Sequence, residues 1–344
     1  IPSLVGSEMC IRDRSEYRHA LEYFSTLPQS HHVLWNDGPR LRRVQKRLRN
    51  DGLAPTERGK GSNVWYCLGY VQALGNTEAV ALHDCDIVTY DRSMLARLIY
   101  PVANPEFAYK FCKGYYARVA DGKLNGRVSR LLVSPLIRTM KTLAPELPYL
   151  DYLDSFRYPL AGEFSFRRDV LNDILIPSDW GLEIGVLSEM YRNYANNRLC
   201  QADIADFYDH KHQDLSAENE QGGLSKMSID ISKALFRKLA TRGVTFNTET
   251  FRSLKATYYR IALDFVETYH NDGVMNGLSL DIHSEEKAVE LFAENIMKAG
   301  EAFLVRPMER PFIPSWNRVI SAVPDILERL YEAVDADHAE FAAQ

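Results

Sequence analysis

The segment Glu78-Ala79-Val80-Ala81-Leu82-His83-Asp84-Cys85-Asp86 indicates both the fold of this chain and the place of its chemistry. Its apolar run predicts a buried strand, and the polar residues that follow mark the point where the strand ends. Two carboxylates one residue apart at a strand exit suit Mg²⁺ or Mn²⁺ bound together with a diphosphate. Taken alone, such a pair of aspartates more often only stabilises a turn.

The regions around this segment predict alternating strands and helices. Short apolar runs favour further strands at residues 32–35, 109–114 and 199–206. Apolar residues at helical spacing predict helices over residues 40–49 and 62–74. Strands that alternate with helices are typical of an α/β layered domain, in which ligands bind beyond the carboxyl ends of the strands.

After about Gly223 the strand-like runs give way to helical stripes. The clearest stripe advances by three or four residues through Phe251, Leu254, Tyr258, Ile261 and Phe265. We therefore predict an α/β domain over residues 15–222, followed by a helical C-terminal subdomain over residues 223–344.

The composition excludes several classes of protein. The chain has 344 residues and a formal net charge of −5, which gives no general attraction to nucleic acid or to anionic membranes. Its five cysteines lack paired spacing, so they indicate neither a disulfide framework nor a zinc ribbon and favour a reducing, cytoplasmic compartment. No apolar stretch approaches the ~20 residues that span a bilayer. We interpret the basic residues of 40–49 as one solvated amphipathic helix.

The first 14 residues, which begin with Ile1, show neither helical nor strand periodicity. They also lack the order of a signal peptide, in which charged residues precede the apolar ones. They resemble a translated sequencing adaptor, and we expect a non-native leader joined to the protein from about Ser15. A disordered natural tail is the alternative.

Other short motifs could bind anions or sugars. Lys60 lies in Arg58-Gly59-Lys60-Gly61 before a predicted helix, where backbone amides and the lysine can meet an anion. Gly126-Arg127-Val128-Ser129 offers an amide, a guanidinium and a hydroxyl to a phosphate, although it also fits an ordinary helix start. Glu183, predicted at a helix N-terminus, could accept hydrogen bonds from a sugar or only stabilise the helix. His210 could add an imidazole to a metal site or lie on the surface.

In chain order, these motifs resemble those of the glucosyl-3-phosphoglycerate synthases. These enzymes are retaining, metal-dependent glycosyltransferases of the GT-A fold, a Rossmann-like fold of nucleotide-diphospho-sugar transferases. The resemblance covers about residues 17–215, and the order of the motifs is more specific than any single one. The matching stretches are residues 59–61, 84–86, 113–116, 126–129, 159–164, 181–185 and 210–213.

The resemblance implies a role for each matching residue. Asp84, Asp86 and Glu183 would be catalytic, and Asp84, Asp86 and His210 would hold Mg²⁺ or Mn²⁺, with Asp86 favoured as the direct ligand. The donor would contact Lys60 through its nucleotide, and its glucose would contact Leu160, Ala161, Gly162 and Glu183. The acceptor would contact Gly126, Arg127, Ser129 and His212. Ser129 stands where the family has threonine, and one extra residue before His210 shifts the register of the two histidines.

The resemblance also implies a first strand and a nucleotide-binding loop before Tyr17, where this chain has the leader-like peptide. Weak nucleotide binding, and with it loss of activity, is therefore expected of this chain without that segment. The implied reaction is retaining transfer of glucose from a nucleotide-diphospho-glucose to the 2-hydroxyl of 3-phosphoglycerate, in the biosynthesis of glucosylglycerate. The expected protein is a cytoplasmic homodimer with neither nucleic-acid nor membrane partners. The alternatives are a transferase like mannosyl-3-phosphoglycerate or mannosylglycerate synthase, and a non-catalytic sugar-nucleotide-binding module.

Overall fold

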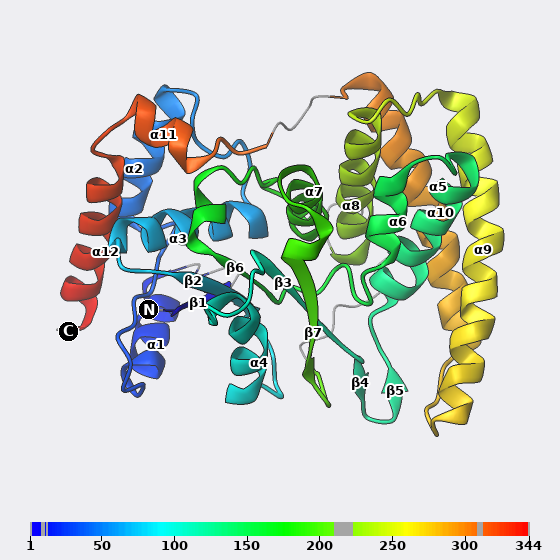
Figure 1. Cartoon of the computed structure of the whole chain (residues 1–344), viewed down its shortest axis with the longest axis horizontal. Helices are drawn as coiled ribbons and strands as arrows, with labels where there is room; N and C mark the ends of the chain where they lie inside the picture. Colours follow the sequence, from blue (N-terminus) through cyan, green and yellow to red (C-terminus); the bar gives the residue numbers. More distant parts are fainter. Residues whose placement is uncertain (1, 8–10, 12, 210–222, 308–311, 343–344) are drawn as a thin grey trace.

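A five-stranded mixed sheet forms the centre of the protein (Figure 1). The structure is a computed structural model that describes residues 2–7, 11, 13–209, 223–307 and 312–342. Along the sheet the strand order is β1-β2-β6-β3-β7, with β6 antiparallel to both of its neighbours and the other pairs parallel. The strands are β1 (Pro2–Ser7), β2 (Ala79–Asp84), β6 (Phe164–Arg167), β3 (Phe111–Tyr116) and β7 (Leu199–Ala205). The predicted α/β fold is confirmed.

Alternate side chains of β2 enter two different cores. Val80 and Leu82 belong to the large core shared with α3 and α7, whereas Ala79 and Ala81 pack with α4 on the other face. A strand that is buried on both faces has no polar side, which explains its uninterrupted apolar run. The helices that cover the sheet are α3 (Lys60–Leu74), α4 (Arg92–Ala103) and α7 (Leu182–Asn193).

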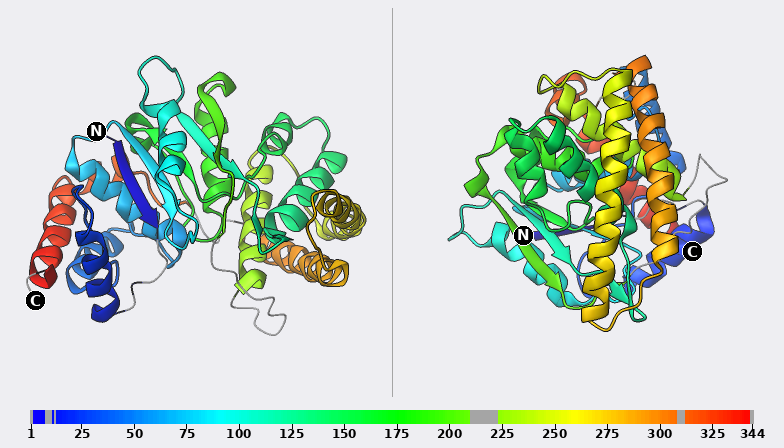
Figure 2. Two further views of the ribbon diagram at one scale, coloured as in Figure 1. Left: turned by 90° about the horizontal axis from the view of Figure 1, so that it is seen from below. Right: turned by 90° about the vertical axis from the view of Figure 1, so that its right-hand side faces the viewer.

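A second group of helices lies beyond β7, beside a small hairpin. Figure 2 shows α9 and α10 as a long antiparallel pair at this end of the molecule, and α5 and α8 pack against them. The hairpin precedes the one-turn π-helix η1. The members of this group are β4 (Val119–Ala120), β5 (Lys123–Leu124), η1 (Val128–Val133), α5 (Ser134–Leu143), α6 (Pro148–Asp154), α8 (Gly223–Ala240), α9 (Thr248–Met275) and α10 (Ile282–Val305).

The last two helices return to the opposite end of the molecule (Figure 1). There α12 (Ile326–Ala342) packs against α1 (Arg14–Ser25), α2 (Pro39–Asn50) and α3, and α11 (Trp316–Ala322) precedes it. The Trp316 ring stacks on that of Trp65 at 4.2 Å. The region after Gly223 is helical as predicted, but its helices are divided between the two ends instead of forming one packed unit. None of the helices within the described residues is long and apolar enough to cross a membrane.

The N-terminal segment, which is expected to be a non-native leader, forms an edge strand. β1 runs parallel to β2, with Pro2 opposite Ala79 and Ser7 opposite Asp84. An edge strand is held by main-chain hydrogen bonds to its neighbour and needs no periodic side-chain pattern of its own. Residues 2–7 of the expected leader therefore belong to the sheet.

The strand predicted at residues 32–35 is not formed, and the segment has no regular secondary structure. Val33 and Trp35 are buried in a small cluster with Tyr17, Leu21 and Phe341 instead of in the sheet. The Tyr17 ring stacks on Trp35 at 5.3 Å and meets Phe341 edge-on at 5.6 Å. A short apolar run also suits a segment that is buried against helices, and the partners of Val33 and Trp35 lie on α1 and α12.

Candidate functional site

Three of the predicted residues meet where β2 ends. Lys60, the first residue of α3, places its Nζ 2.6 Å from Asp84 Oδ1 and 2.9 Å from Glu183 Oε1. Glu183 lies in the first turn of α7, and Asp84 is the last residue of β2. The side chains of Lys60 and Glu183 are buried, while that of Asp84 is 22% exposed. The structure thus joins three segments that are distant in the sequence.

The ammonium of Lys60 is fixed in its charged form. Burial by itself lowers the pKa of a lysine, but the charges of Asp84 and Glu183 and their hydrogen bonds outweigh burial and raise the pKa of Lys60 above its usual range. One cation between two carboxylates leaves the group with one net negative charge. The partly exposed carboxylate of Asp84 is therefore electrostatically suited to binding a further cation.

The approach of α3 to this site depends on Gly61. A Cβ at Gly61 would lie 2.9 Å from the carbonyl carbon of Pro177, so any side chain there would push α3 away. The Ser62 amide donates a hydrogen bond to the carbonyl of Ser178 at 3.3 Å. The glycines of the Gly59-Lys60-Gly61 motif thus allow the close contact that carries Lys60 to the carboxylates.

The predicted sugar-binding turn, residues 160–162, lies against the same carboxylate. A Cβ added to Gly162 would lie 2.6 Å from Asp84 Cγ, so only glycine fits beside Asp84 without displacing it. Lys113 is buried and donates a hydrogen bond from Nζ to the carbonyl of Ala161. Leu160 is partly buried against the large core. A lysine from β3 thereby fixes the backbone of the turn.

We expect Lys113 to give the protein a stability that rises with pH in the alkaline range. Burial lowers the pKa of Lys113 from 10.5 to about 8. Between these values the unfolded chain binds the proton more tightly than the folded protein, so the free energy of unfolding rises with pH by up to about 1.4 kcal/mol per pH unit. Below pH 8 both states hold the proton and the effect vanishes.

Urea unfolding of the protein and of Lys113→Met, at pH 7.5 and pH 9.5, measures this effect. The stability of the unaltered protein relative to the variant should be greater at pH 9.5. Lys110→Met is the control, because Lys110 forms a more exposed ion pair with Asp169 on the surface. An equal difference at both pH values would show that Lys113 keeps its proton when buried.

Glu163 links the turn to a group of tyrosines and was not among the predicted site residues. It is fully buried and accepts hydrogen bonds from Tyr116 at 2.6 Å, from Tyr208 at 2.9 Å and from the amide of Asp84 at 3.3 Å. Burial, with the nearby charge of Asp84, raises the pKa of Glu163. The rings of Tyr116 and Tyr208 stack at 3.6 Å. One signal was present in the sequence: an acid inside the otherwise apolar segment 159–164.

The aspartate pair fits a divalent cation only in part. Asp86 is exposed in the loop that joins β2 to α4, two residues beyond Asp84. Their hard carboxylate oxygens are the ligands that Mg²⁺ and Mn²⁺ prefer, and these ions keep positions for phosphate and water. Within the described residues no group of three or more His, Cys, Asp and Glu side chains is placed to hold a metal. The predicted third ligand, His210, lies outside the described residues, as does His212.

The predicted acceptor residues occupy the loop between the hairpin and η1. Gly126 has a φ of +80°, which favours glycine, and a Cβ there would lie 3.0 Å from the hydroxyl of Tyr158. The Tyr158 ring lies 5.2 Å from that of Tyr116, whose hydroxyl binds Glu163. Tyrosines thus separate this loop from Asp84. Ser129 is buried within η1.

Arg127 is engaged by the C-terminal helices. Its Nε donates to Glu285 Oε1 at 2.7 Å and its Nη2 donates to Ser284 Oγ at 3.0 Å, both in the first turn of α10. Its side chain is 33% exposed. This partnership between residues about 160 positions apart was not foreseen from the sequence.

The fold and the site together define a class of protein. Lys60, at the start of α3, lies beside the acidic residues at the carboxyl end of β2 in a mixed sheet. The turn at residues 160–162 lies against Asp84, and the loop that contains Arg127 lies beyond it. This is the architecture of a GT-A glycosyltransferase.

Comparison with known proteins gives the family. The glucosyl-3-phosphoglycerate synthase of Persephonella marina is 42% identical over 325 residues, covering 94% of this chain and 80% of the relative. That of Methanococcoides burtonii is 40% identical over 330 residues, covering 95% and 80%. The chain belongs to the glucosyl-3-phosphoglycerate synthase family.

Solved structures are similar at lower identity. The glucosyl-3-phosphoglycerate synthase of Mycobacterium tuberculosis, in complex with Mn²⁺, uridine diphosphate and glucosyl-3-phosphoglycerate, is 19% identical to this chain with a TM-score of 0.46. The match covers 70% of this chain and 78% of the other. No protein-family model matches the chain.

Proposed function

We propose that this chain transfers glucose from a nucleotide-diphospho-glucose, with UDP-glucose as the first candidate, to the 2-hydroxyl of 3-phosphoglycerate, giving glucosyl-3-phosphoglycerate. Membership of the family supports the reaction. The observation that carries the assignment of the site is Lys60, which lies between Asp84 and Glu183 at the start of α3. The proposal includes the cytoplasmic homodimer that the sequence resemblance implies.

At the donor end, Lys60 and the N-terminus of α3 bind the diphosphate. Cleavage of the anomeric bond builds negative charge on the leaving nucleotide, and a fixed ammonium at that point stabilises it. Asp84 and Asp86 would hold Mg²⁺ or Mn²⁺, which would supply further Lewis-acid stabilisation of the same charge. The Lys60 ammonium needs no rearrangement for this role, because its two carboxylate partners already orient it.

Beside the anomeric carbon, Glu183 and the turn at residues 160–162 hold the glucose. The sugar gains positive charge in the transition state, and a buried carboxylate and backbone carbonyls favour that charge. Lys113 keeps the turn rigid through its hydrogen bond to the Ala161 carbonyl. Glu163 holds the same turn from the other side through Tyr116 and Tyr208.

At the acceptor end, Gly126, Arg127 and Ser129 bind the phosphate and carboxylate of 3-phosphoglycerate, with His212 as the further contact. We propose attack by the 2-hydroxyl on the same face that the diphosphate leaves, with a leaving phosphate oxygen as the base. Retention of the anomeric configuration follows from this geometry.

Donor competition and product analysis test the proposal. The chain, incubated with 3-phosphoglycerate, Mg²⁺ and equal amounts of UDP-glucose, ADP-glucose and GDP-mannose, is expected to form an α-linked glucosyl product, identified by NMR from the anomeric coupling. A mannosyl product would favour the mannosyl-3-phosphoglycerate alternative. A β-linked product would contradict same-face attack, and binding of all three donors without turnover would favour a sugar-nucleotide-binding module.

A further inference from the structure

One carboxylate joins residues 124–127, which we call the acceptor loop, to helix α10. Glu285, in the first turn of α10, is buried and accepts from Arg127 Nε at 2.7 Å and from Arg130 Nη1 at 2.8 Å. Arg127 and Arg130 lie three residues apart, at the end of the acceptor loop and the start of η1. The two guanidiniums thus share the two oxygens of a single side chain.

The two arginines have different surroundings. Arg130 is buried, donates to the carbonyls of Leu124 and Asn125 at 3.2 and 2.9 Å, and lies 4.9 Å from the ring centre of Tyr269. Arg127 is one-third exposed, and within the described part of the chain its Nη1 has no hydrogen-bond partner. Arg130 therefore closes the loop, while Arg127 presents one edge of its guanidinium outward.

The charges of this group favour an anion. Two guanidiniums and one carboxylate leave one net positive charge, and the exposed member of the group is Arg127. A guanidinium whose other edge is already fixed by a carboxylate loses little side-chain freedom when it binds a phosphate or carboxylate.

A second contact attaches the same region to the helices. The Ser279 amide, in the connection between α9 and α10, donates to the carbonyl of Gly122 in the hairpin turn at 2.9 Å. Asp281 then caps α10 by accepting from the Ser284 amide, so the first turn of α10 is fixed relative to the hairpin. Both sides of residues 124–127 are thereby held by one helix pair.

We propose that Glu285 is a positioning residue that holds Arg127 in the orientation that receives the anionic groups of the acceptor. The C-terminal helix pair α9–α10 then contributes to acceptor binding without touching the acceptor. This inference rests on the proposed function, because that function places 3-phosphoglycerate at this loop.

Binding of each substrate to Glu285→Gln tests the role. Glutamine keeps the shape but removes the charge that orients two guanidiniums, and the dissociation constant for 3-phosphoglycerate, measured by calorimetry, is expected to rise about tenfold. The dissociation constant for UDP with Mg²⁺ should stay within about twofold. Ser284→Ala, a milder change that removes one partner of Arg127, should weaken 3-phosphoglycerate binding about threefold, and Glu285→Asp should recover part of the loss.

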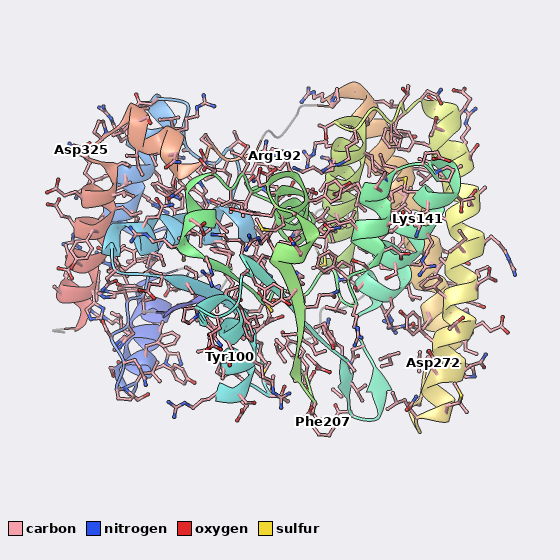
Figure 3. The ribbon with its side chains drawn as sticks, viewed as in Figure 1. Tyr100, Lys141, Arg192, Phe207, Asp272 and Asp325 are labelled. Atoms are coloured by element: carbon pink, nitrogen blue, oxygen red, sulfur yellow. The ribbon has the colours of Figure 1, made fainter. Side chains whose placement is uncertain are left out.

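Glu189→Gln is the matched control. Glu189 is a buried carboxylate shared by Lys238 at 3.2 Å and Arg192 at 3.0 Å, so it has the same charge environment as Glu285. Arg192 lies at the upper edge of the molecule in Figure 3, whereas the β4–β5 hairpin lies at the lower edge in the same view (Figure 1). This variant should lose stability as Glu285→Gln does but bind both substrates normally.

The outcomes separate the inference from the proposed function. The positioning role would be overturned if Glu285→Gln weakened the binding of UDP and of 3-phosphoglycerate equally. It would also be overturned if Glu189→Gln weakened 3-phosphoglycerate binding as much as Glu285→Gln does. Unchanged 3-phosphoglycerate binding in both Ser284→Ala and Glu285→Gln would have the same consequence. Turnover by the unaltered protein is measured in parallel and decides the proposed function by itself. Failure of the unaltered protein to bind 3-phosphoglycerate would overturn the inference whatever that turnover shows.

Discussion

Turnover of Asp84→Asn is expected to fall about 10³-fold, the size of effect that follows the loss of one group that stabilises transition-state charge. Asparagine keeps the shape of Asp84 beside Gly162 but loses the negative charge needed for a divalent cation. Lys60 retains Glu183 as a partner, so the free energy of unfolding should fall by only about 1–2 kcal/mol. Initial rates with UDP-glucose, 3-phosphoglycerate and Mg²⁺, together with urea unfolding, measure both effects.

Asp91→Asn is the control for this variant. Asp91 lies at the end of the loop that follows Asp84 and caps α4 by accepting from the Ser93 amide at 2.7 Å, a role that asparagine fills equally well. Its activity should match that of the unaltered protein. If Asp84→Asn keeps more than a tenth of the activity, Asp84 is not part of the metal site.

The Lys60→Met variant is expected to lose both activity and stability. Removing the ammonium leaves Asp84 and Glu183 facing each other without a cation, and breaking a buried ion pair by deleting one partner costs about 3 kcal/mol. Turnover should fall about 10²-fold or more, because the leaving diphosphate loses a fixed positive charge. Calorimetric unfolding and initial rates at pH 7.5 measure the two losses.

The comparison variant is Lys110→Met, which removes a lysine from a more exposed pair with Asp169. Such pairs contribute about 1 kcal/mol or less, so its stability and turnover should barely change. A stability loss in Lys60→Met no greater than that of Lys110→Met would mean that the site tolerates two adjacent carboxylates. The group of Lys60, Asp84 and Glu183 could then not be the electrostatic centre of the site.

Local patterns in the sequence were sufficient to predict which strand or helix carries Asp84, Lys60 and Glu183. The apolar run of β2 and the aspartates after it predicted a buried strand ending in acidic residues, and the structure has both. Lys60 at the start of α3 and Glu183 in the first turn of α7 were also placed correctly on their elements. Each of these features depends on neighbouring residues only, which periodicity and helix-terminus chemistry describe well.

The features that were missed depend on residues far apart in the chain. Nothing near Arg127 in sequence indicates that Glu285 binds it, and nothing near Trp316 indicates that α11 and α12 return to α3. Glu163 is an acid in an apolar segment, but its role depends on Tyr116 at the end of β3 and on Tyr208 in the segment after β7. Val33 and Trp35 show the converse, because tertiary burial produced a strand-like pattern without a strand.

The arrangement as a whole suggests how one small sheet serves two anionic substrates. The donor side is built from β2, α3 and α7 around Lys60, and the acceptor loop is attached to α10 through Glu285. Between them lie Tyr158 and Tyr116, linked through Glu163 to the amide of Asp84. Lys60 and Glu285 form separate ion pairs, one on each side, so substitutions at these two residues should affect different substrates.

Product formation from UDP-glucose and 3-phosphoglycerate, with Mg²⁺ and then with excess EDTA, tests whether the chain is a metal-dependent glucosyltransferase. We expect glucosyl-3-phosphoglycerate and uridine diphosphate in equal amounts with Mg²⁺, no product with EDTA, and recovery when Mg²⁺ is restored. Turnover that is unchanged by EDTA would contradict the metal role of Asp84 and Asp86. No product under any of these conditions, from protein shown by calorimetry to be folded and to bind UDP with Mg²⁺, would contradict the assigned reaction itself.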